Sequence, residues 1–416
     1  MSLAWISVGA LVLAVAVSCT TAVNVGILAL AMALIVGVFI GGDSVDMVLE
    51  GFPTDLFMTL VGVTLLFSIA ECNGTLSRFT GRAIRLCRGH AGALPIMFFL
   101  LGFAIATIGA GATPAAALLA PPAMAVAGRA GVPPFLMAVM AGNGVLAGTL
   151  SPFAPTGVVA HGVMERIGLG GVEWQTFAYN AFAHALVGFG TFLLFGGWKL
   201  FRAEYARAEA VAAEPQDASP METRHWLTAA GIALLIVAVV GFGQNVGMIA
   251  LIVATALILL RAVEESRAVQ RMPWGVILMV TGVTVLVAML QENEGLALIA
   301  EGISRVSSPA TIEAIVAFGA GLISVYSSTS GVVLPAFLPM APQLAETLGG
   351  LDPLPIAWSM AVAASLVDLS SLSTVGALFI ASAAAGSNVR ALFNALLAWG
   401  MSMSVVGALL GWLLFG

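Results

Sequence analysis

Residues 148–157 read Gly-Thr-Leu-Ser-Pro-Phe-Ala-Pro-Thr-Gly, and they interrupt a stretch, 130–164, that contains no charged residue. Glycine permits non-helical backbone angles, while proline removes a backbone donor and blocks the preceding helical turn. The flanking sequence is apolar enough for a membrane helix, so this decapeptide predicts a helix that is broken at membrane depth. Unwound backbone is tolerated there only where it lines a cavity or is buried in protein.

The whole chain is as apolar as the sequence around this break. Of its 416 residues 60% are apolar and only 9% are charged, and the mean hydropathy is +1.06. Soluble domains contain about a quarter charged residues, so a soluble fold is excluded. At about 20 residues per crossing, there is room for roughly ten to twelve spans. Strands of a barrel would alternate polar and apolar residues, so we expect an all-α polytopic membrane protein.

Several function classes are excluded by composition and motifs. The net charge of -6 leaves no basic surface for nucleic acid. No motif of a hydrolase, metalloprotease or nucleotide-binding loop is present, so we expect no enzyme and no cofactor. The three cysteines lie far apart in the sequence and form no metal-binding pattern; they are Cys19, Cys72 and Cys87.

Charge-free windows mark the membrane segments. Two windows, 1–42 and 225–260, are each long enough for two spans and split near 21–24 and 241–245. The other windows are 56–70, 89–128, 130–164, 174–198, 272–291, 314–345, 369–389 and 391–416. We expect the first spans at about 3–20, 24–41 and 54–71.

The basic residues predict the orientation. With both termini outside, only Arg166 and Arg305 of the 15 basic residues lie outside, and the other thirteen are cytoplasmic. We therefore expect a multi-pass protein of the inner (cytoplasmic) membrane. This threading requires segments 92–128 and 309–346 to enter and leave by the same face. Each is either a re-entrant hairpin or a pair of full spans, and charge alone does not separate these options.

The chain divides into two similar halves. We expect a first repeat at 1–200, a charged cytoplasmic linker at 201–225 and a second repeat at 226–416. Matching residues recur at offsets of 219–221; they are 24–26 with 245–247, 62–64 with 282–284, Asn73 with Asn293, Pro134 with Pro355, and Gly157 with Gly376. Each half has an odd number of crossings, so the second is inverted relative to the first. Inverted repeats are typical of secondary transporters, which bind substrate at the repeat interface near mid-membrane.

Each half contains two breaks at equivalent places, 109–114 and 148–157 in the first and 326–331 and 368–376 in the second. A broken helix exposes N–H groups that attract anions. It also exposes carbonyls that, with Ser and Thr hydroxyls, coordinate a small cation such as sodium. Four such ends can therefore bind a carboxylate without a buried basic residue. For any one cluster alone, helix packing is the commoner role.

Four polar residues within apolar segments have two interpretations each. Asp368 is the one acid well inside such a segment, and it serves either a coupling ion or proton, or a structural bond to the nearby backbone break. Asn143 either packs between helices or lines the site. His161 and His184 are expected to be hydrogen-bonded core or interfacial histidines rather than proton carriers.

The order of spans, the two hairpins with Ser/Thr/Gly tips and the two broken helices resemble the ion-transporter superfamily of carboxylate carriers, which includes the divalent-anion/sodium symporters. The first half is more similar to malonate-carrier (MatC-type) dicarboxylate permeases. The resembling stretches are 24–30, 51–53, 109–122, 151–157, 327–331 and 368–376. One difference is that the symporters carry Ser-Asn-Thr at both hairpin tips, whereas the tips here are 111–113 (Gly-Ala-Thr) and 328–330 (Ser-Thr-Ser).

The resemblance implies a homodimer in which hairpins and broken helices move together as an elevator-type transporter. It implies that the substrate-binding residues are Gly111, Ala112, Thr113, Ser151, Pro152, Thr156, Ser328, Thr329, Ser330, Ser371, Ser373 and Thr374. The expected coupling-ion residues, with sodium at the same breaks, are Thr113, Asn143, Ser151, Thr329, Asp368 and Ser373.

These observations predict a cation-coupled symporter for a small di- or tricarboxylate such as malonate, succinate or citrate. Sodium is the expected coupling cation, with protons as the alternative. The remaining alternatives are a membrane permease subunit of a binding-protein-dependent carboxylate carrier, a proton-coupled anion exchanger or exporter, and a channel. The expected partners are a carboxylate anion, the lipid bilayer and a second copy of the chain.

Overall fold

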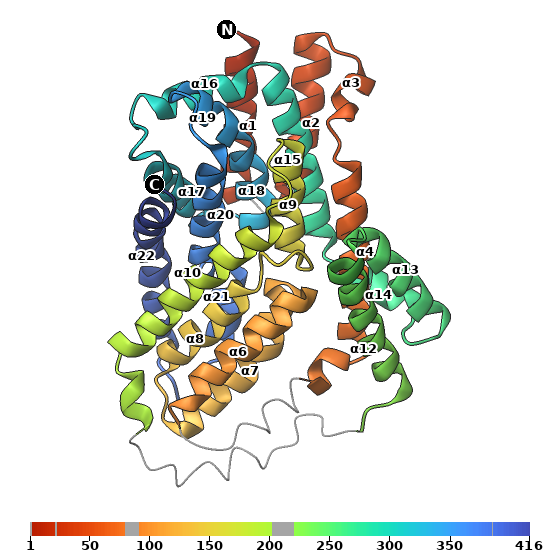
Figure 1. The fold of residues 1–416 in the computed structure, drawn as a ribbon, viewed down its shortest axis with the longest axis vertical. Coiled ribbons are helices and arrows are strands. Elements are labelled where there is room, and N and C mark those ends of the chain that lie inside the picture. The colour runs from red at the N-terminus through yellow and green to blue at the C-terminus, as the bar shows by residue number, and fades with distance from the viewer. Residues whose placement is uncertain (1, 21–22, 80–90, 202–219, 385) are drawn as a thin grey trace.

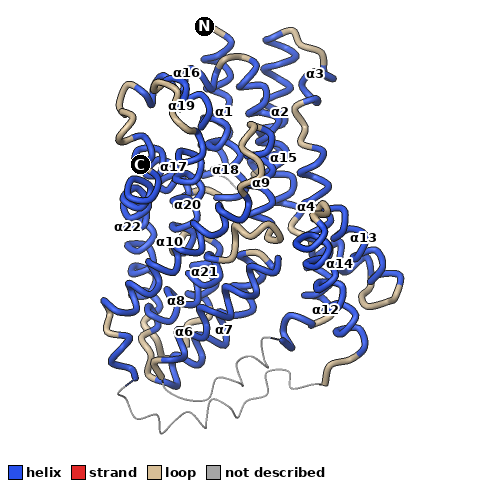
Figure 2. The backbone as a smooth tube through the Cα atoms, viewed as in Figure 1, coloured by secondary structure: helices blue, strands red, loops and turns tan. Residues whose placement is uncertain are grey.

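The computed structural model describes residues 2–20, 23–79, 91–201, 220–384 and 386–416, and every regular element in those ranges is a helix (Figure 2). The all-α prediction is confirmed. Up to residue 201 the elements are α1 (Leu3–Thr20), α2 (Val25–Leu34), η1 (Ile35–Gly41), α3 (Val45–Glu50), α4 (Thr54–Cys72), α6 (Ala93–Ile105), η2 (Ala106–Ala110), α7 (Ala112–Ala130), α8 (Pro134–Ala147), α9 (Pro155–Arg166), α10 (Glu173–Leu194) and η3 (Gly197–Phe201).

From residue 223 onward the elements are α12 (Thr223–Ile236), η4 (Val237–Gly241), α13 (Val246–Leu259), α14 (Glu265–Arg271), α15 (Trp274–Glu292), α16 (Gly295–Ser304), α17 (Ile312–Tyr326), η5 (Thr329–Val333), α18 (Leu334–Phe337), η6 (Leu338–Met340), α19 (Ala341–Thr347), α20 (Pro353–Leu366), η7 (Val367–Leu369), α21 (Thr374–Ala381) and α22 (Val389–Phe415). Residues 202–219, which form most of the predicted linker, lie outside the described residues, and α12 begins inside that linker.

Seven helical runs among the described residues are long and apolar enough to cross a membrane. They are Thr54–Cys72, Ala93–Ala110, Glu173–Leu194, Thr223–Gly241, Trp274–Glu292, Pro353–Ala381 and Val389–Phe415. Shorter apolar helices such as α2 and α8 accompany them. Large apolar side chains also face outward, Phe39, Leu194 and Leu259 being 78–85% exposed. These features fit a multi-pass membrane protein.

The predicted splits are confirmed, and each ends in an asparagine that caps the next helix. The Asn24 side chain accepts from the N–H of Gly26 at 2.9 Å, and the Asn245 side chain accepts from the N–H of Met248 at 3.0 Å. A capping side chain satisfies one of the N–H groups left free at a helix start. Residues 21–22 of the first split are outside the described residues.

Over the residues that the structure describes, the two halves carry their helices in the same order. Helices α4 and α15 both contain 19 residues, and helices α8 and α20 both contain 14. The second hairpin differs from the first because its second arm is not one helix. The chain from Thr329 to Thr347 is divided into η5, α18, η6 and α19, whereas α7 is continuous.

The repeated glycines lie where helices from different halves cross. Helix α2 packs on α15, and α13 packs on α4. A Cβ on Gly26 would lie 2.0 Å from the Leu278 carbonyl oxygen, and one on Gly282 would lie 2.0 Å from the Gly26 carbonyl oxygen. In the other pair, a Cβ on Gly62 would lie 2.3 Å from the Gly247 carbonyl oxygen. These repeated glycines therefore permit backbone-to-backbone contact at both crossings.

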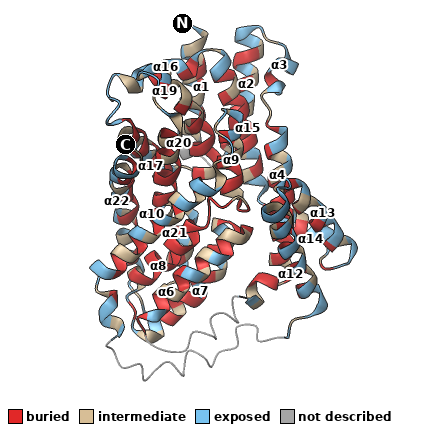
Figure 3. Cartoon of the chain, viewed as in Figure 1, coloured by how far each residue is buried: buried red, intermediate tan, exposed pale blue. Residues whose placement is uncertain are grey.

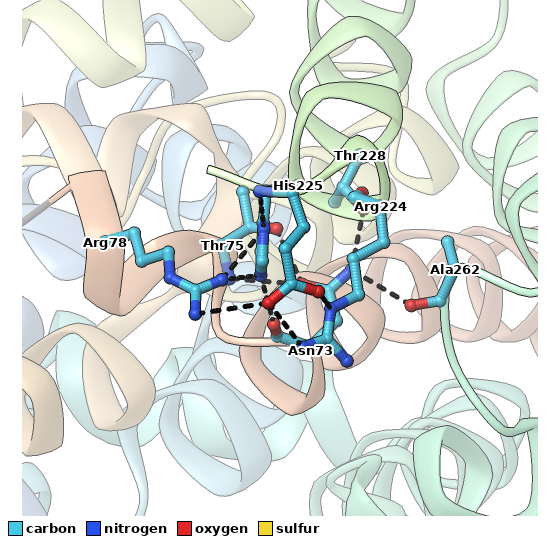
Figure 4. Close-up of polar contacts among 8 residues, drawn as sticks. Asn73, Thr75, Arg78, Arg224, His225, Thr228 and Ala262 are labelled. Carbon is cyan, nitrogen blue, oxygen red and sulfur yellow. Dashed lines mark hydrogen bonds and ion pairs between the residues drawn. The ribbon is translucent and has the colours of Figure 1, made fainter. Parts of the chain in front are cut away.

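The repeated asparagines also bond across the halves. At the end of α4 the Asn73 amide donates to the Thr228 hydroxyl at 2.7 Å, and at the end of α15 the Asn293 amide donates to the Ser7 hydroxyl at 3.0 Å. Figure 4 shows the first of these contacts, where the ring of His225 also donates from Nε2 to the Asn73 carbonyl at 2.9 Å. Each half is thereby tied to the first helix of the other.

The helices pack in two groups (Figure 1). We call the first the α8–α20 group; it contains α6, α7, α8, α10, α17, α20, α21 and α22. The second, the α4–α15 group, contains α1, α2, α4, α12, α13 and α15. The centre of the α8–α20 group is deeply buried (Figure 3). Helix α8 is buried from Leu136 to Ala147, and α20 is buried from Ile356 to Leu366 except at Trp358.

Candidate substrate and cation site

The break in the second half holds an acid against the tip of the second hairpin. Helix α20 tightens into η7, which carries Asp368, and the chain then runs in extended and turn geometry to α21. The Thr329 hydroxyl donates to Asp368 Oδ1 at 2.5 Å and lies 3.2 Å from the Ala364 carbonyl oxygen. The Ser324 hydroxyl, from α17, lies 3.5 Å from Asp368 Oδ1 and bonds to Thr329.

This cluster, Asp368 with Thr329, Ser324 and the Ala364 carbonyl, presents only oxygen atoms. Carboxylate, hydroxyl and carbonyl oxygens are the ligands that hard cations prefer. Asp368 remains partly exposed, whereas Thr329 and Ser324 are buried. We call this the acid–hydroxyl cluster. Its composition fits a small cation or a proton.

Serine hydroxyls close both helix starts at this second break. Ser328 accepts from the N–H of Gly331 at 3.0 Å, at the start of η5. Ser373 accepts from the N–H of Gly376 at 3.1 Å, at the start of α21, and it donates to the carbonyls of Ser370 and Asp368. Fewer free N–H groups are therefore left for an anion here.

The first-half break has a different chemistry. The Ser151 hydroxyl donates to the Thr107 carbonyl at 2.6 Å and accepts from the N–H of Phe153 at 3.2 Å, which ties the broken helix to the first hairpin. The hairpin turns through two glycines in left-handed or positive-φ backbone, Gly109 (φ 119°) and Gly111 (φ 77°). Only glycine adopts such angles without strain.

Two helix starts meet at this first break without a side-chain cap. Helix α7 follows Gly111 and α9 follows Ala154, and neither residue provides a capping hydrogen bond. A Cβ on Gly111 would lie 3.1 Å from the ring of Pro155, so the two starts are adjacent. The first N–H groups of a helix have no intrahelical partner, and the dipole there is positive. The pair of starts is therefore suited to a carboxylate.

The interrupted segments meet in the structure. Helix α9 packs against η5 and α18 of the second hairpin, and α7 packs against α21. The two broken helices touch as well, because a Cβ on Gly142 of α8 would lie 2.3 Å from the Leu369 side chain of η7. The structure thus packs the segments that contain the four predicted breaks against one another.

The predicted site residues differ in exposure. Gly111, Asn143, Ser151, Thr329 and Ser371 are buried; Ala112, Pro152, Thr156, Ser328, Ser330, Asp368 and Ser373 are partly exposed; Thr113 and Thr374 are exposed. Asn143 lies within α8, hydrogen-bonded to His184 at 2.9 Å. The buried hydroxyl of Ser371 has no hydrogen-bond partner among the described residues.

Sequence reasoning missed Ser324 and the Thr107 carbonyl. Ser324 lies in α17 and Thr329 in η5, and the extended residues Ser327 and Ser328 separate the two helices, so no helical spacing in the sequence pairs these hydroxyls. A carbonyl ligand leaves no signal in the sequence, because every residue has one.

A cleft of about 820 Å³ opens beside the first break. Among the predicted site residues it reaches only Pro152, and it does not extend to the acid–hydroxyl cluster. Its wall includes His161, whose Nε2 donates to the Leu150 carbonyl at 3.0 Å. The cleft is bounded by the start of α4, helix α9, the start of α10 and the loop from α12 to α13. It therefore separates α10 of the α8–α20 group from α4 of the α4–α15 group.

Residues 1–149 match the family described as Dicarboxylate carrier protein MatC N-terminus. The resemblance to MatC-type permeases is confirmed over this part of the chain. The fold is similar to that of the Alcanivorax borkumensis YdaH transporter, described as having an unusual topology. The TM-score is 0.53 at 16% sequence identity, covering 89% of this chain and 87% of that chain. No curated protein sequence matches. Family match and fold together support a carboxylate transporter.

Proposed function

We propose that the chain is a secondary active transporter that carries a small di- or tricarboxylate across the inner membrane with a coupling cation. The packing of the interrupted segments, one pair with uncapped helix starts and the other with an acid and hydroxyls, carries this proposal. A carboxylate needs N–H donors and a compensating cation, and these two breaks offer both. The dicarboxylate-carrier match of residues 1–149 supports the substrate class.

We assign the substrate carboxylate mainly to the first break and the coupling cation to the acid–hydroxyl cluster. Ala112, Thr113, Thr156 and Gly157 carry the N–H groups of the uncapped starts. Sodium is the first choice for the cation, because the cluster is made of oxygen ligands. A proton on Asp368 is the second choice, since a carboxyl group next to hydroxyls can bind one.

The reciprocal contacts support an inverted-repeat, elevator-type mechanism. The α2–α15 and α4–α13 crossings exchange the same glycines, and the Asn73–Thr228 bond matches the Asn293–Ser7 bond. A twofold relationship between the halves would produce this pattern. In this mechanism the α8–α20 group moves against the α4–α15 group, which forms a homodimer. Both termini are outside and the linker 201–225 is cytoplasmic, as the distribution of basic residues indicates.

Uptake of labelled succinate, malonate and citrate into proteoliposomes of the purified chain tests the proposal. We expect accumulation above equilibrium with an inward sodium gradient at fixed pH. Accumulation driven only by a pH gradient would assign coupling to protons. Uptake that requires an added binding protein would support the permease-subunit alternative, and no uptake of any carboxylate would contradict the substrate class.

A further inference from the structure

Three buried polar side chains connect helices of both halves next to the breaks. His184 of α10 lies between Asn143 of α8 and Ser365 of α20, and all three are at most 1% exposed. The predicted role of His184 as a hydrogen-bonded core histidine fits this position. Asn143 is one of the coupling-ion residues that the sequence analysis expects, but His184 and Ser365 have no role in the proposed carboxylate or cation site.

The hydrogen bonds fix which ring nitrogen carries the proton. The Asn143 amide nitrogen donates to the Val139 carbonyl at 2.9 Å, so its Oδ1 is left to accept. His184 Nδ1 is 2.9 Å from that oxygen and donates to it. In a neutral ring Nε2 then accepts, and the Ser365 hydroxyl lies 3.1 Å from it. Every polar atom of the ring has one partner.

Each end of this network is one or two helical turns from a break. Asn143 lies in α8 ahead of Gly148, and its neighbour Gly142 packs against Leu369 of η7. Ser365 directly follows Ala364, whose carbonyl is 3.2 Å from the Thr329 hydroxyl, and Asp368 comes one turn later. The network therefore spans from the broken helix of the first half to the acid–hydroxyl cluster of the second.

We infer that His184 is a positioning residue that couples the two breaks. This inference rests on the proposed function, in which the first break binds the carboxylate and the second break binds the cation. A fully satisfied buried network has one geometry, since any rearrangement leaves a polar atom unpaired. His184 therefore holds α8 and α20 in a fixed relation. A cation that binds Asp368 and Thr329 and fixes their positions therefore also fixes the positions of the helix starts at the first break. Because coupling between two binding sites is reciprocal, bound substrate increases the affinity for the cation by the same factor.

The first test measures the accessibility of the first break by cysteine labelling and does not require transport. A cysteine reporter, Thr113→Cys, is placed at the exposed tip of the first hairpin, with Cys19, Cys72 and Cys87 changed to serine. Maleimide labelling is compared in sodium chloride, in choline chloride and at lowered pH. We expect the cation bound at the second break to slow labelling at the first. In His184→Asn, which keeps the bond to Asn143 but cannot reach Ser365, this effect disappears.

The second test measures coupling in succinate uptake. The half-saturating succinate concentration is determined at low and at saturating driving cation, and we expect the two values to differ by about tenfold in the unaltered chain. His184→Gln and Ser365→Ala each bring this ratio close to one, and combining them adds no further loss because they break one network. Thr191→Val is the matched control. It removes a buried hydroxyl two turns along α10 that bonds only to the Val187 carbonyl, and it keeps the ratio.

The outcomes separate this inference from the proposed function. A cation effect on Thr113→Cys labelling that survives in His184→Asn overturns the inference, as does the absence of any such effect in the unaltered His184 background. Lack of carboxylate uptake contradicts the proposed function and leaves the labelling result to decide the coupling. Should the histidine variants aggregate, Ser365→Ala replaces them in both tests, because it leaves the ring and its bond to Asn143 in place.

Discussion

The two halves are alike where they form the α4–α15 group and unlike where their helices break. At the crossings the same residue types make the same contacts, Gly26 with Gly282 and Gly247 with Gly62. At the breaks the first half offers uncapped helix starts and no acid, whereas the second offers capped starts and Asp368.

This difference concerns only a few positions. Ser151 and Ser370 occupy equivalent places, and each accepts from the N–H two residues later. Three residues after these serines, however, the first half has Ala154 where the second half has the capping Ser373. Two residues before them, the first half has Thr149 where the second half has Asp368. A repeated frame with a few unlike residues can therefore provide one anion-binding end and one cation-binding end.

Removing the acid is the change with the largest expected effect. Asp368→Asn should lower coupled succinate accumulation by about a hundredfold, because a contact with a charged group contributes up to about 3 kcal/mol and each 1.4 kcal/mol is a factor of ten. Its matched control is Thr149→Ala at the equivalent first-half position, where the hydroxyl bonds to the Leu146 carbonyl of its own helix. That variant should transport nearly as well as the unaltered chain. Equal losses would remove the proposed difference between the breaks.

Asp368→Asn and the unaltered chain together also test the coupling ion. Full accumulation by Asp368→Asn with an unaltered pH dependence would end proton coupling through this residue. Retained pH-driven accumulation with no response to sodium in the unaltered chain would instead end the sodium assignment.

The sequence predicts the repeated crossings, breaks and caps of the helices, which we call the frame, better than it predicts the side-chain contacts between those helices. Glycine, proline and asparagine identify crossings, breaks and caps because each has a backbone property that few other residues share. Thus the sequence matches 24–26 with 245–247 and 62–64 with 282–284, and the structure shows that these segments form the two crossings. The prolines at 335, 339 and 342 also divide the second arm of the second hairpin, which the sequence analysis described only as a hairpin.

The partners of polar side chains could not be read in the same way. His184 and Ser365 are 181 positions apart, and nothing in either local sequence specifies the other. The bond from Ser151 ends on the Thr107 carbonyl, an atom that every residue offers. Helix packing decides these contacts, and small residues such as Gly142 allow the approach without indicating its partner.

The equivalence of the α2–α15 and α4–α13 crossings can be tested by the free energy of unfolding of glycine variants. Gly26→Ala and Gly247→Ala should each lower the free energy of unfolding by about 1–3 kcal/mol, because the added methyl group meets backbone atoms of the crossing helix. Gly9→Ala is the control, since a Cβ there meets nothing within 4 Å. Thermal unfolding in detergent measures all three. A loss in one glycine variant but not in the other would contradict the equivalence of the two crossings.

The smallest change addresses the anion-binding end most directly. Ala154→Ser gives α9 the cap that Ser373 gives α21, so the new hydroxyl accepts from the N–H of Gly157 that we assign to the carboxylate. A cap contributes about 1 kcal/mol, so the half-saturating succinate concentration should rise about fivefold while the cation dependence is unchanged. Ala154→Gly is the control because it adds no acceptor. The variant is informative since it should stabilise the helix and weaken substrate binding together, a combination that general damage to the fold does not produce. Unchanged succinate affinity in a more stable protein would move the carboxylate away from the start of α9.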